Sequence, residues 1–388
     1  MPLIYLLAGE ASGDVLGGRL IAALRAQRPD VKFAGVGGPR MAEHGLASLY
    51  PMTDLSVMGI IEVLPRLRLL RRRHAETVAD IARLRPGVVV TVDSPGFMHH
   101  VLQDVADLGI PRVHYVAPQV WAWRAHRVKR YPGLWDRLLC LLPFEPSWFA
   151  QHGLDATFVG HPVLESGADR GDAARFRATH GLQPDQPVLV MMPGSRRSEA
   201  PRLLPVFGRT LHLLAAQVPG LRPVVPASAA VSDVVRRAAA DWPVPPIIVT
   251  DLQDKHDAYA AANAAVTKSG TSTLELALAG VPMAVAYRVN LLTGLLARRM
   301  IRVPHVAMVN LLAGRRLVPE LLQRDCTPEH LSATVLGLLR DPAQAAAQRA
   351  GFRTLLDSLR PSAGLPSEAA AREVLDVLDQ AGGHRQAA

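Results

Sequence analysis

The sequence is poor in cysteine and has no long apolar run. Its only two cysteines, Cys140 and Cys326, have no C-x-x-C or similar spacing, so neither a disulfide framework nor a structural zinc site is supported. No run approaches the roughly 18 apolar residues of a membrane-spanning helix. The N-terminus has no basic region followed by an apolar segment and a cleavage site, as a secretory signal would. We therefore expect a cytosolic protein, either soluble or attached to a membrane surface.

Lysine is also scarce, since only four of the 43 basic residues are lysines, namely Lys32, Lys129, Lys255 and Lys268. The net charge of +9 nevertheless favours anionic partners such as nucleotides, phosphorylated substrates, nucleic acid or an acidic membrane. The preference for arginine could also reflect codon bias. Hydrophobic residues make up 49% of the 388 residues, enough for a large core and about two or three domains.

Short apolar runs alternate with longer helical patterns such as 13–28 and 77–84, which predicts an α/β fold with parallel, doubly wound sheets. A polar stretch near residue 165 separates two such series. We expect domains at 1–165 and 166–345, and a helical segment at 346–388 that packs back on the N-terminal domain. The expected strands are 3–7, 88–92, 112–116, 137–142 and 157–159, then 188–192, 222–226, 247–250, 264–267 and 283–287.

Residues 57–74 differ from the rest because apolar residues fall on one helical stripe and arginines lie mostly elsewhere. Leu67 and Leu70 belong to the stripe, and Arg68, Arg71 and Arg72 to the basic remainder. A basic amphipathic helix can lie in a membrane interface. The alternative is a surface helix with a solvated arginine face, and Pro65 could begin a second helical piece.

The second half contains two loops that suit an anion. In "VLVMMPGSRRSE", a strand is followed by Gly194 and Ser195, which can present N–H groups at a helix start, and by Arg196, which adds a fixed positive charge. In "VTKSGTSTLELAL", the hydroxyls and N–H groups before a second helix suit a diphosphate. This loop contains Ser269, Gly270, Thr271 and Ser272.

Glu275 lies one turn into that second helix, where its carboxylate could accept hydrogen bonds from two ribose hydroxyls. The alternative interpretation is structural. The two loops would then be ordinary βα turns with capping serines, and Glu275 would be a capping glutamate. Because both loops occur in one domain, we favour a nucleotide diphosphate as the ligand.

In the first half, Asp93 follows a buried strand in "VVVTVDSPGF", at the edge where open α/β sheets bind ligands. A carboxylate at that edge could act as a general base, or it could cap the next helix. Gln119, Trp121 and Trp123, in "APQVWAWR", could grip a sugar, a phosphate or an acyl chain, or form a packed loop. The histidines form no recognisable ligand set, and we predict no metal.

Ten segments occur in the order found in the lipid-A-disaccharide synthase family, which the chain resembles over about residues 3–325. They are "AGEASGD", "VMGIIEVLPRL", "DSPGF", "YVAPQVWAWR", "LLPFE", "FVGHPV", "MMPGSRRSE", "KSGTSTLELAL", "PMAVAYR" and "NLLAGRRLVPELLQ". The resemblance implies an inverting, metal-independent glycosyltransferase of the GT-B fold, with two Rossmann-like domains facing a cleft.

The implied reaction joins UDP-2,3-diacylglucosamine to 2,3-diacylglucosamine 1-phosphate (lipid X), giving the β-1,6-linked disaccharide 1-phosphate and UDP. No cofactor is implied. The implied location is the cytoplasmic surface of the inner membrane of a Gram-negative cell, and a homodimer is one state the resemblance allows.

The resemblance assigns Asp93 a catalytic role, and we interpret it as the base for the acceptor's primary hydroxyl. Arg196, Lys268 and the loop 269–272 would then meet the charge of the departing UDP, with Tyr287 and Asn310 as weaker candidates for the donor site. The loop "AGEASGD" lacks the G-x-G-x-x-G spacing, so we expect no dinucleotide there. It would instead lie on the acceptor side, with Ser12 and Gly13 lining the cleft. Glu10 and Asp14 would bond sugar hydroxyls or cap the helix, Asp14 being the more structural of the two.

The family usually has a second acid where this sequence has Gly96, which leaves the details of base catalysis open. One rival function is another UDP-sugar enzyme of the same architecture, such as an epimerase or a hydrolase. A second is a basic binding module without catalysis. Only the net charge supports that module, and we predict no nucleic-acid partner.

Overall fold

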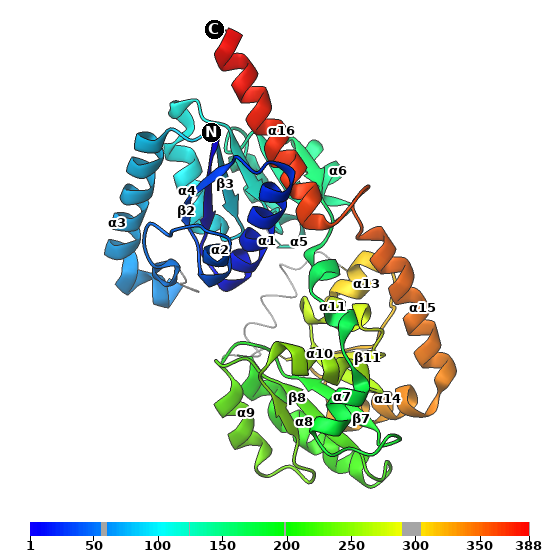
Figure 1. The fold of residues 1–388 in the computed structure, drawn as a ribbon. Coiled ribbons are helices and arrows are strands. Elements are labelled where there is room, and N and C mark those ends of the chain that lie inside the picture. Colours follow the sequence, from blue (N-terminus) through cyan, green and yellow to red (C-terminus); the bar gives the residue numbers. More distant parts are fainter. Residues whose placement is uncertain (56–59, 124, 198, 289–303, 388) are drawn as a thin grey trace. The chain divides into compact units, whose positions relative to one another are not determined.

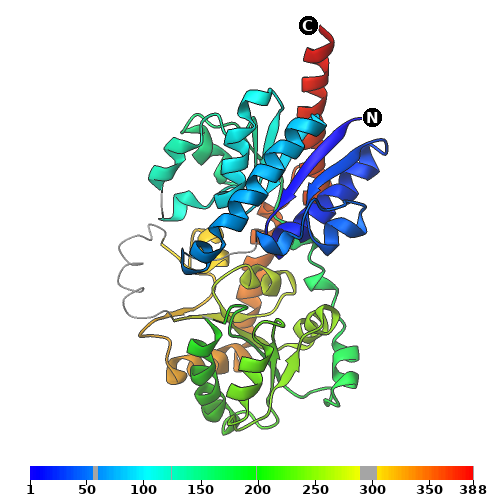
Figure 2. The ribbon, with the colours of Figure 1, turned by 90° about the vertical axis from the view of Figure 1, so that its left-hand side faces the viewer.

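A computed structural model describes residues 1–387 apart from 56–59, 124, 198 and 289–303. The described chain divides into two compact units. Unit 1 comprises Met1–Pro162 together with Leu359–Ala388, and unit 2 comprises Val163–Ser358. Each unit is built around a six-stranded parallel sheet (Figures 1 and 2), so the predicted α/β class is confirmed.

The sheet of unit 1 has the order β2-β1-β3-β4-β5-β6. Its inner strands β1 and β3 are mostly apolar, as expected where helices cover both faces of a parallel sheet, and every residue of β3 is buried. The strands are β1 (Leu3–Ala8), β2 (Lys32–Val36), β3 (Val88–Val92), β4 (Arg112–Tyr115), β5 (Arg137–Cys140) and β6 (Ala156–Phe158). The helices are α1 (Ala11–Gln27), α2 (Pro39–Glu43), α3 (Ile60–Leu84), α4 (Pro95–Asp104), α5 (Val120–Trp123), α6 (Glu145–Ala150) and α16 (Pro366–Ala387).

The sheet of unit 2 has the order β12-β11-β10-β7-β8-β9. Its strands are β7 (Val188–Met192), β8 (Arg222–Pro226), β9 (Ile247–Val249), β10 (Ala264–Lys268), β11 (Met283–Tyr287) and β12 (Glu320–Leu322). Its helices are α7 (Ala173–Thr179), α8 (Ala200–Ala215), α9 (Ser232–Ala239), α10 (Leu252–Ala261), α11 (Ser272–Leu278), α13 (Met308–Ala313), α14 (Pro328–Arg340) and α15 (Pro342–Ser358).

Helix α16 packs on unit 1 beside α1 (Figure 1), although it is the last helix of the chain. Its small and apolar residues, among them Ala370 and Val374, are buried in the core of that unit. Two arginines of unit 1 also bind it: Arg28 forms a bidentate ion pair with Asp379, and Arg137 pairs with Glu373. The C-terminal helix therefore completes the core of the N-terminal unit.

The structure corrects one expected domain boundary. The expected division at residue 345 falls inside α15, and the structure places the division at 358. The reason is that α15 buries Phe352 and Leu355, and Gln348 exchanges hydrogen bonds with the backbone of Met283 in β11. The other division lies at 162, three residues before the expected one.

Helix α3 runs without a break through Pro65, so no second helical piece begins there. The expected amphipathic stretch lies partly outside the described residues, because 56–59 are not described. Leu67 is exposed, as are Arg68, Arg71 and Arg72, whereas Leu70 is half-buried against the core of unit 1. Leu70 thus packs partly on the protein's own core, and its contact with a membrane stays a prediction.

Candidate functional site

In unit 1, the candidate residues gather at the carboxyl edge of the sheet. Ala8, Val92 and Tyr115 are register partners across β1, β3 and β4, so the three strands end side by side. The connections that follow them hold Glu10, Asp93 and Gln119. This shared edge is where ligands bind in open parallel sheets.

Asp93 lies in a turn with unusual backbone geometry. Asp93 and Ser94 both have left-handed conformations, with φ of 54° and 45°, and the Asp93 N–H donates to the Tyr115 carbonyl at 2.9 Å. Non-glycine residues seldom adopt this region, but aspartate does so more readily than most. The turn leads directly into α4 and leaves the Asp93 side chain half-buried at the sheet edge.

Two glycines let the "AGEASGD" segment lie against this turn. A Cβ on Gly9 would lie 3.1 Å from the Ser94 hydroxyl, and one on Gly13 would lie 3.3 Å from the Val92 carbonyl. The segment is mostly helical, because α1 already begins at Ala11. Within it, Ser12 is exposed, whereas Gly13 is buried against β3.

Asp14 has a structural role, which corrects its placement among the acceptor-side candidates. Its carboxylate is buried and accepts hydrogen bonds from the backbone N–H groups of Gly38, Arg40 and Met41 at 2.8–3.0 Å. These groups form the N-terminus of α2, where an acidic side chain satisfies otherwise unpaired donors. Both carboxylate oxygens are therefore used inside the protein.

Glu145 was not among the candidates predicted from the sequence. It is buried and accepts hydrogen bonds from the indole N–H of Trp121 at 3.0 Å and from the N–H groups of Leu141 and Leu142. Burial raises the pKa of Glu145 to about 7, although these three donors act in the opposite direction. Glu145 thus ties Trp121 to the loop after β5. Gln119 is exposed, and the side chain of Trp123 lies outside the described part of the chain.

An aromatic cluster surrounds His99 on α4, the helix that follows the Asp93 turn. His99 of α4 packs against His114 of β4 and against Tyr131 and Trp135, with ring centres 5.1–5.6 Å apart. His114 also shares a 2.7 Å hydrogen bond with Thr91. Burial lowers the pKa of His99 to about 4 and that of His114 to about 3. Both histidines are therefore neutral in the folded protein at neutral pH.

We expect unit 1 to lose stability on acidification, and His99→Phe to reduce that loss. The ordinary histidine pKa is 6.5, so below it the unfolded chain binds protons that folded His99 does not accept until about pH 4. The phenylalanine variant should flatten the pH dependence of the unfolding free energy by up to about 1.4 kcal/mol per pH unit. Urea unfolding between neutral pH and about pH 5 measures the slope. The exposed His100→Gln serves as the control, and an unchanged slope in His99→Phe would contradict the assignment.

In unit 2, β7, β10 and β11 are neighbours and bring the predicted donor-site residues together. Gly194 follows β7 with φ of 108°, and a Cβ there would lie 3.0 Å from the Glu199 carboxylate and 3.3 Å from the Lys268 side chain. Glu199 accepts from Arg196 at 3.0 Å and from Lys268 at 2.9 Å through the same oxygen. Two loops far apart in sequence thus place two cations around one carboxylate. Ser195, which lies between Gly194 and Arg196 in the sequence, is exposed.

The loop from Lys268 to α11 is held by its own hydroxyls. Ser269 donates to the Val306 carbonyl at 2.6 Å, and Ser272 hydrogen-bonds Thr267 at 2.9 Å. Gly270 has φ of 155°, with nothing within 4 Å of a Cβ placed on it, and Thr271 is exposed. Because the hydroxyls of Ser269 and Ser272 are engaged, the groups facing solvent are the open Gly270 backbone and Thr271.

Glu275 lies on the first turn of α11, and its carboxylate contacts α10. The Lys255 ammonium is 2.8 Å from Glu275 Oε2, and the Tyr259 hydroxyl donates to the same oxygen at 3.2 Å. Neither Lys255 nor Tyr259 was predicted as a site residue. Tyr287, at the end of β11, is half-buried with its ring centre 5.8 Å from the Lys268 ammonium. Burial and then the nearby Glu199 raise the pKa of Tyr287.

Asn310 is buried and saturated by the protein, which corrects its expected contact with the donor. Its amide accepts from the N–H groups of Leu317 and Val318 and donates to the Val318 carbonyl and to Glu320. Glu320 in turn accepts from the N–H of Val306, the residue whose carbonyl holds Ser269. Asn310 therefore supports the α11 loop from behind.

The chain matches one family of known proteins along nearly its whole length. A model of the family "Lipid-A-disaccharide synthetase" matches residues 4–374. A relative from Gluconobacter oxydans, named lipid-A-disaccharide synthase, is 60% identical over 378 residues, which are 97% of this chain and 91% of that protein.

Two solved structures share the fold at low sequence identity. UDP-GlcNAc 2-epimerase from Neisseria meningitidis bound to UDP-GlcNAc has a TM-score of 0.63 at 12% identity, covering 98% of this chain and 100% of that one. CalG4, the calicheamicin glycosyltransferase, has a TM-score of 0.57 at 18% identity, covering 98% and 99%. These likenesses bear on the fold alone and confirm the GT-B class.

Proposed function

Because the chain belongs to the lipid-A-disaccharide synthase family, we propose that it transfers 2,3-diacylglucosamine from UDP-2,3-diacylglucosamine to 2,3-diacylglucosamine 1-phosphate. The products are the β-1,6-linked disaccharide 1-phosphate and UDP. The observation that carries this proposal is the 60% identity over 97% of the chain. An epimerase or hydrolase is not favoured, since the likeness to an epimerase is in the fold alone.

In the proposed mechanism, Asp93 is the general base. Its carboxylate removes the proton from the acceptor's primary hydroxyl while that oxygen attacks the anomeric carbon of the donor. The bond between the anomeric carbon and the diphosphate oxygen breaks on the opposite side, so the configuration inverts. The place of Asp93 at the ligand-binding edge of its sheet supports this role.

We assign the departing diphosphate to the cations of unit 2. Arg196 and Lys268 already converge on the Glu199 carboxylate, so both can reach one anionic group in this loop pair. The backbone at Gly270 and the exposed Thr271 lie beside them at the start of α11. Preorganised charges of this kind stabilise a leaving anion without a metal ion, and activity in the presence of EDTA would test that part of the proposal.

The remaining candidates divide between donor and acceptor. We assign Glu275 to the ribose hydroxyls, because its carboxylate lies one turn from the diphosphate loop. The acceptor-side groups of unit 1 are the exposed Ser12 and Gln119 and the half-buried Glu10. Trp121, whose indole donates to Glu145, is the fourth of these groups.

The reaction is tested by product analysis. Purified protein is incubated with the UDP-linked donor, with lipid X, or with both, and the lipids are resolved by mass spectrometry. The disaccharide 1-phosphate and UDP should appear in equal amounts, and only when both substrates are present. Release of UDP without lipid X would favour a hydrolase, and an altered sugar on intact donor would favour an epimerase.

We further propose that α3 attaches the protein to the cytoplasmic surface of the inner membrane. Among the described residues, none of the helices is long and apolar enough to cross a bilayer. Leu67, Arg68 and Arg71 are exposed on α3, and a surface of this composition suits an anionic interface. Arg72 contributes less, because it is paired with Glu76 at 2.8 Å.

Membrane attachment predicts that the triple variant L67S/R68Q/R71Q leaves anionic vesicles. Each arginine near such a surface contributes about 1 kcal/mol, so with Leu67 the affinity should fall by roughly a hundredfold. Sedimentation with phosphatidylglycerol vesicles measures it. The matched control, L252S/R236Q/R237Q, removes an exposed leucine and two exposed arginines from unit 2 and should leave sedimentation unchanged. Equal loss in both variants would assign the binding to net charge rather than to α3.

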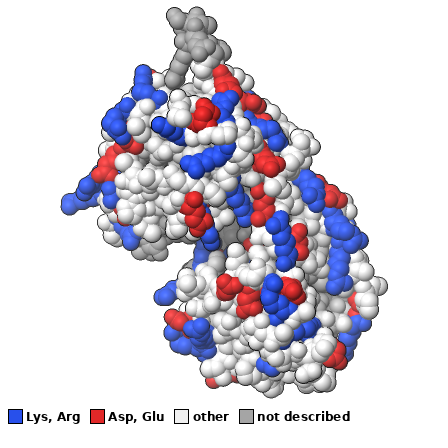
Figure 3. All heavy atoms as spheres, viewed as in Figure 1, with Lys and Arg blue, Asp and Glu red and all other residues white. Residues whose placement is uncertain are grey.

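On the face shown in Figure 3, basic and acidic side chains are interspersed over both units. Acidic side chains therefore accompany the basic ones on this face. A nucleic-acid partner would be matched by a continuous basic stripe, and its absence stays a prediction.

A further inference from the structure

The two oxygens of the Glu275 carboxylate have different surroundings. Oε2 contacts both the Lys255 ammonium, at 2.8 Å, and the Tyr259 hydroxyl, at 3.2 Å. Among the described residues, none forms a hydrogen bond to Oε1. One oxygen is thus fixed by the protein, and the other keeps its capacity to accept hydrogen bonds from a ligand.

The two groups that hold Oε2 are themselves rigidly placed. Lys255 and Tyr259 are one turn apart on α10, and the Lys255 ammonium lies 5.6 Å from the centre of the Tyr259 ring. Tyr259 is only 1% exposed, and its hydroxyl also lies 3.4 Å from the Met192 sulfur at the end of β7. A side chain with so little free space can hold its hydroxyl in one position.

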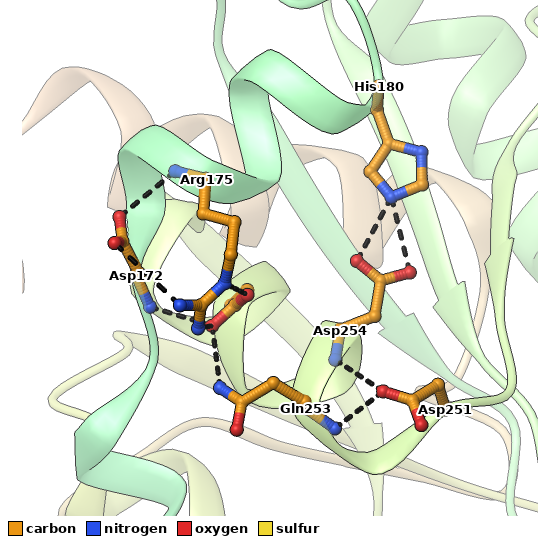
Figure 4. Close-up of polar contacts among 7 residues, drawn as sticks. Asp172, Arg175, His180, Asp251, Gln253 and Asp254 are labelled. Atoms are coloured by element: carbon orange, nitrogen blue, oxygen red, sulfur yellow. Dashed lines mark hydrogen bonds and ion pairs between the residues drawn. The ribbon is translucent and has the colours of Figure 1, made fainter.

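Helix α10 is fixed on its other side by α7, as Figure 4 shows. Arg175 of α7 binds the Asp257 carboxylate at 2.5 and 2.6 Å, and His180 contacts Asp254 at 3.0 Å. Asp251 caps the start of α10 by accepting from two backbone N–H groups. At Gly171, a Cβ would collide with the His256 carbonyl of α10, so the chain just before α7 passes directly against this helix. Helix α10, which bears Lys255 and Tyr259, is therefore held in place along its length.

We propose that Lys255 and Tyr259 are positioning residues for the nucleotide's ribose: by holding Oε2 of Glu275, they direct Oε1 to the ribose hydroxyls. The inference rests on the proposed donor-binding function. Lys255 supplies the charge that keeps a largely buried carboxylate in place, and Tyr259 sets its rotation. Neither residue contacts the nucleotide itself.

Calorimetric titration with UDP and with 2′,3′-dideoxy-UDP tests this role. The wild-type protein should prefer UDP by at least about tenfold, because hydrogen bonds to a charged group are lost with the dideoxy ligand. Lys255→Met should weaken UDP about tenfold and leave dideoxy-UDP within about twofold. Tyr259→Phe, which removes one oxygen from a buried ring, should also weaken UDP selectively, but by less than Lys255→Met. Lys32→Met, at an exposed lysine of unit 1, should change neither affinity.

Equal weakening of both ligands by Lys255→Met and Tyr259→Phe would overturn the inference, because a purely structural defect does not distinguish the two nucleotides. Equal affinity of the wild-type protein for UDP and dideoxy-UDP would also overturn it, by removing the ribose contact while leaving the transfer reaction intact. Failure of the wild-type protein to bind either ligand would instead contradict the proposed function. If Lys255→Met does not fold, Tyr259→Phe decides the question alone.

Discussion

Asp93→Asn is expected to lower the rate of disaccharide formation about a thousandfold, the scale of a lost general base. Asparagine has nearly the same shape but cannot take a proton from the acceptor hydroxyl. It also tolerates the left-handed backbone that Asp93 adopts at φ of 54°, so the turn into α4 should remain. The rate is measured at saturating donor and acceptor, and UDP affinity by calorimetry should be unchanged.

This choice of variant matters because Asp93→Ala would combine two effects. Alanine seldom adopts the left-handed region, so it would disturb the turn as well as remove the carboxylate. The exposed Asp107→Asn, beyond the end of α4, is the matched control and should keep full activity. Turnover within tenfold of wild type in Asp93→Asn would remove Asp93 from the role of base.

The second large effect is expected for Arg196→Ala, about a hundredfold loss in kcat/KM, in line with other lost transition-state contacts to a developing anion. The structure gives a reason beyond the loss of one cation. Arg196 and Lys268 share the Glu199 carboxylate, whose own burial would raise its pKa but whose contacts with these two cations leave the pKa lowered. Without Arg196, Glu199 would pair with Lys268 alone and offset the remaining positive charge.

The neighbouring Arg197→Ala is a close control for that variant. Arg197 is also exposed, but its guanidinium donates to the Ala230 carbonyl at 2.8 Å rather than to Glu199. Its replacement should leave kcat/KM within about twofold. Equal losses in the two variants would mean that general charge, rather than the position of Arg196, determines donor use.

Most of the fold follows from the sequence because most buried parallel strands are short runs rich in apolar residues. All ten predicted strands are present, and Val88–Val92, Val188–Met192, Arg222–Pro226 and Met283–Tyr287 have the predicted bounds. The two strands that were missed, β2 and β12, lie at the edges of their sheets. Lys32 in β2 is exposed and Glu320 in β12 faces a helix start, so neither strand has a clear apolar run.

The site was less predictable, because its decisive partners are distant in sequence. Nothing near Asp14 indicates that its carboxylate accepts hydrogen bonds from the N–H groups of Gly38, Arg40 and Met41. Likewise, nothing near Asn310 indicates that its amide is saturated. Lys255 is one of four lysines, yet only its distance of 2.8 Å from Glu275 connects it with the site. Patterns within a loop predicted which residues are polar or charged. The folded structure showed which of them are already hydrogen-bonded to other groups of the protein.

The return of α16 to unit 1 has a consequence for how the protein is made. Unit 2 is one continuous segment, Val163–Ser358, whereas unit 1 needs residues from both ends of its described chain. During synthesis, unit 2 can close its core as soon as α15 leaves the ribosome. The part of the unit 1 core that Val374 and Leu378 later complete stays open until the last helix emerges. The first unit to be translated is therefore the last to be completed.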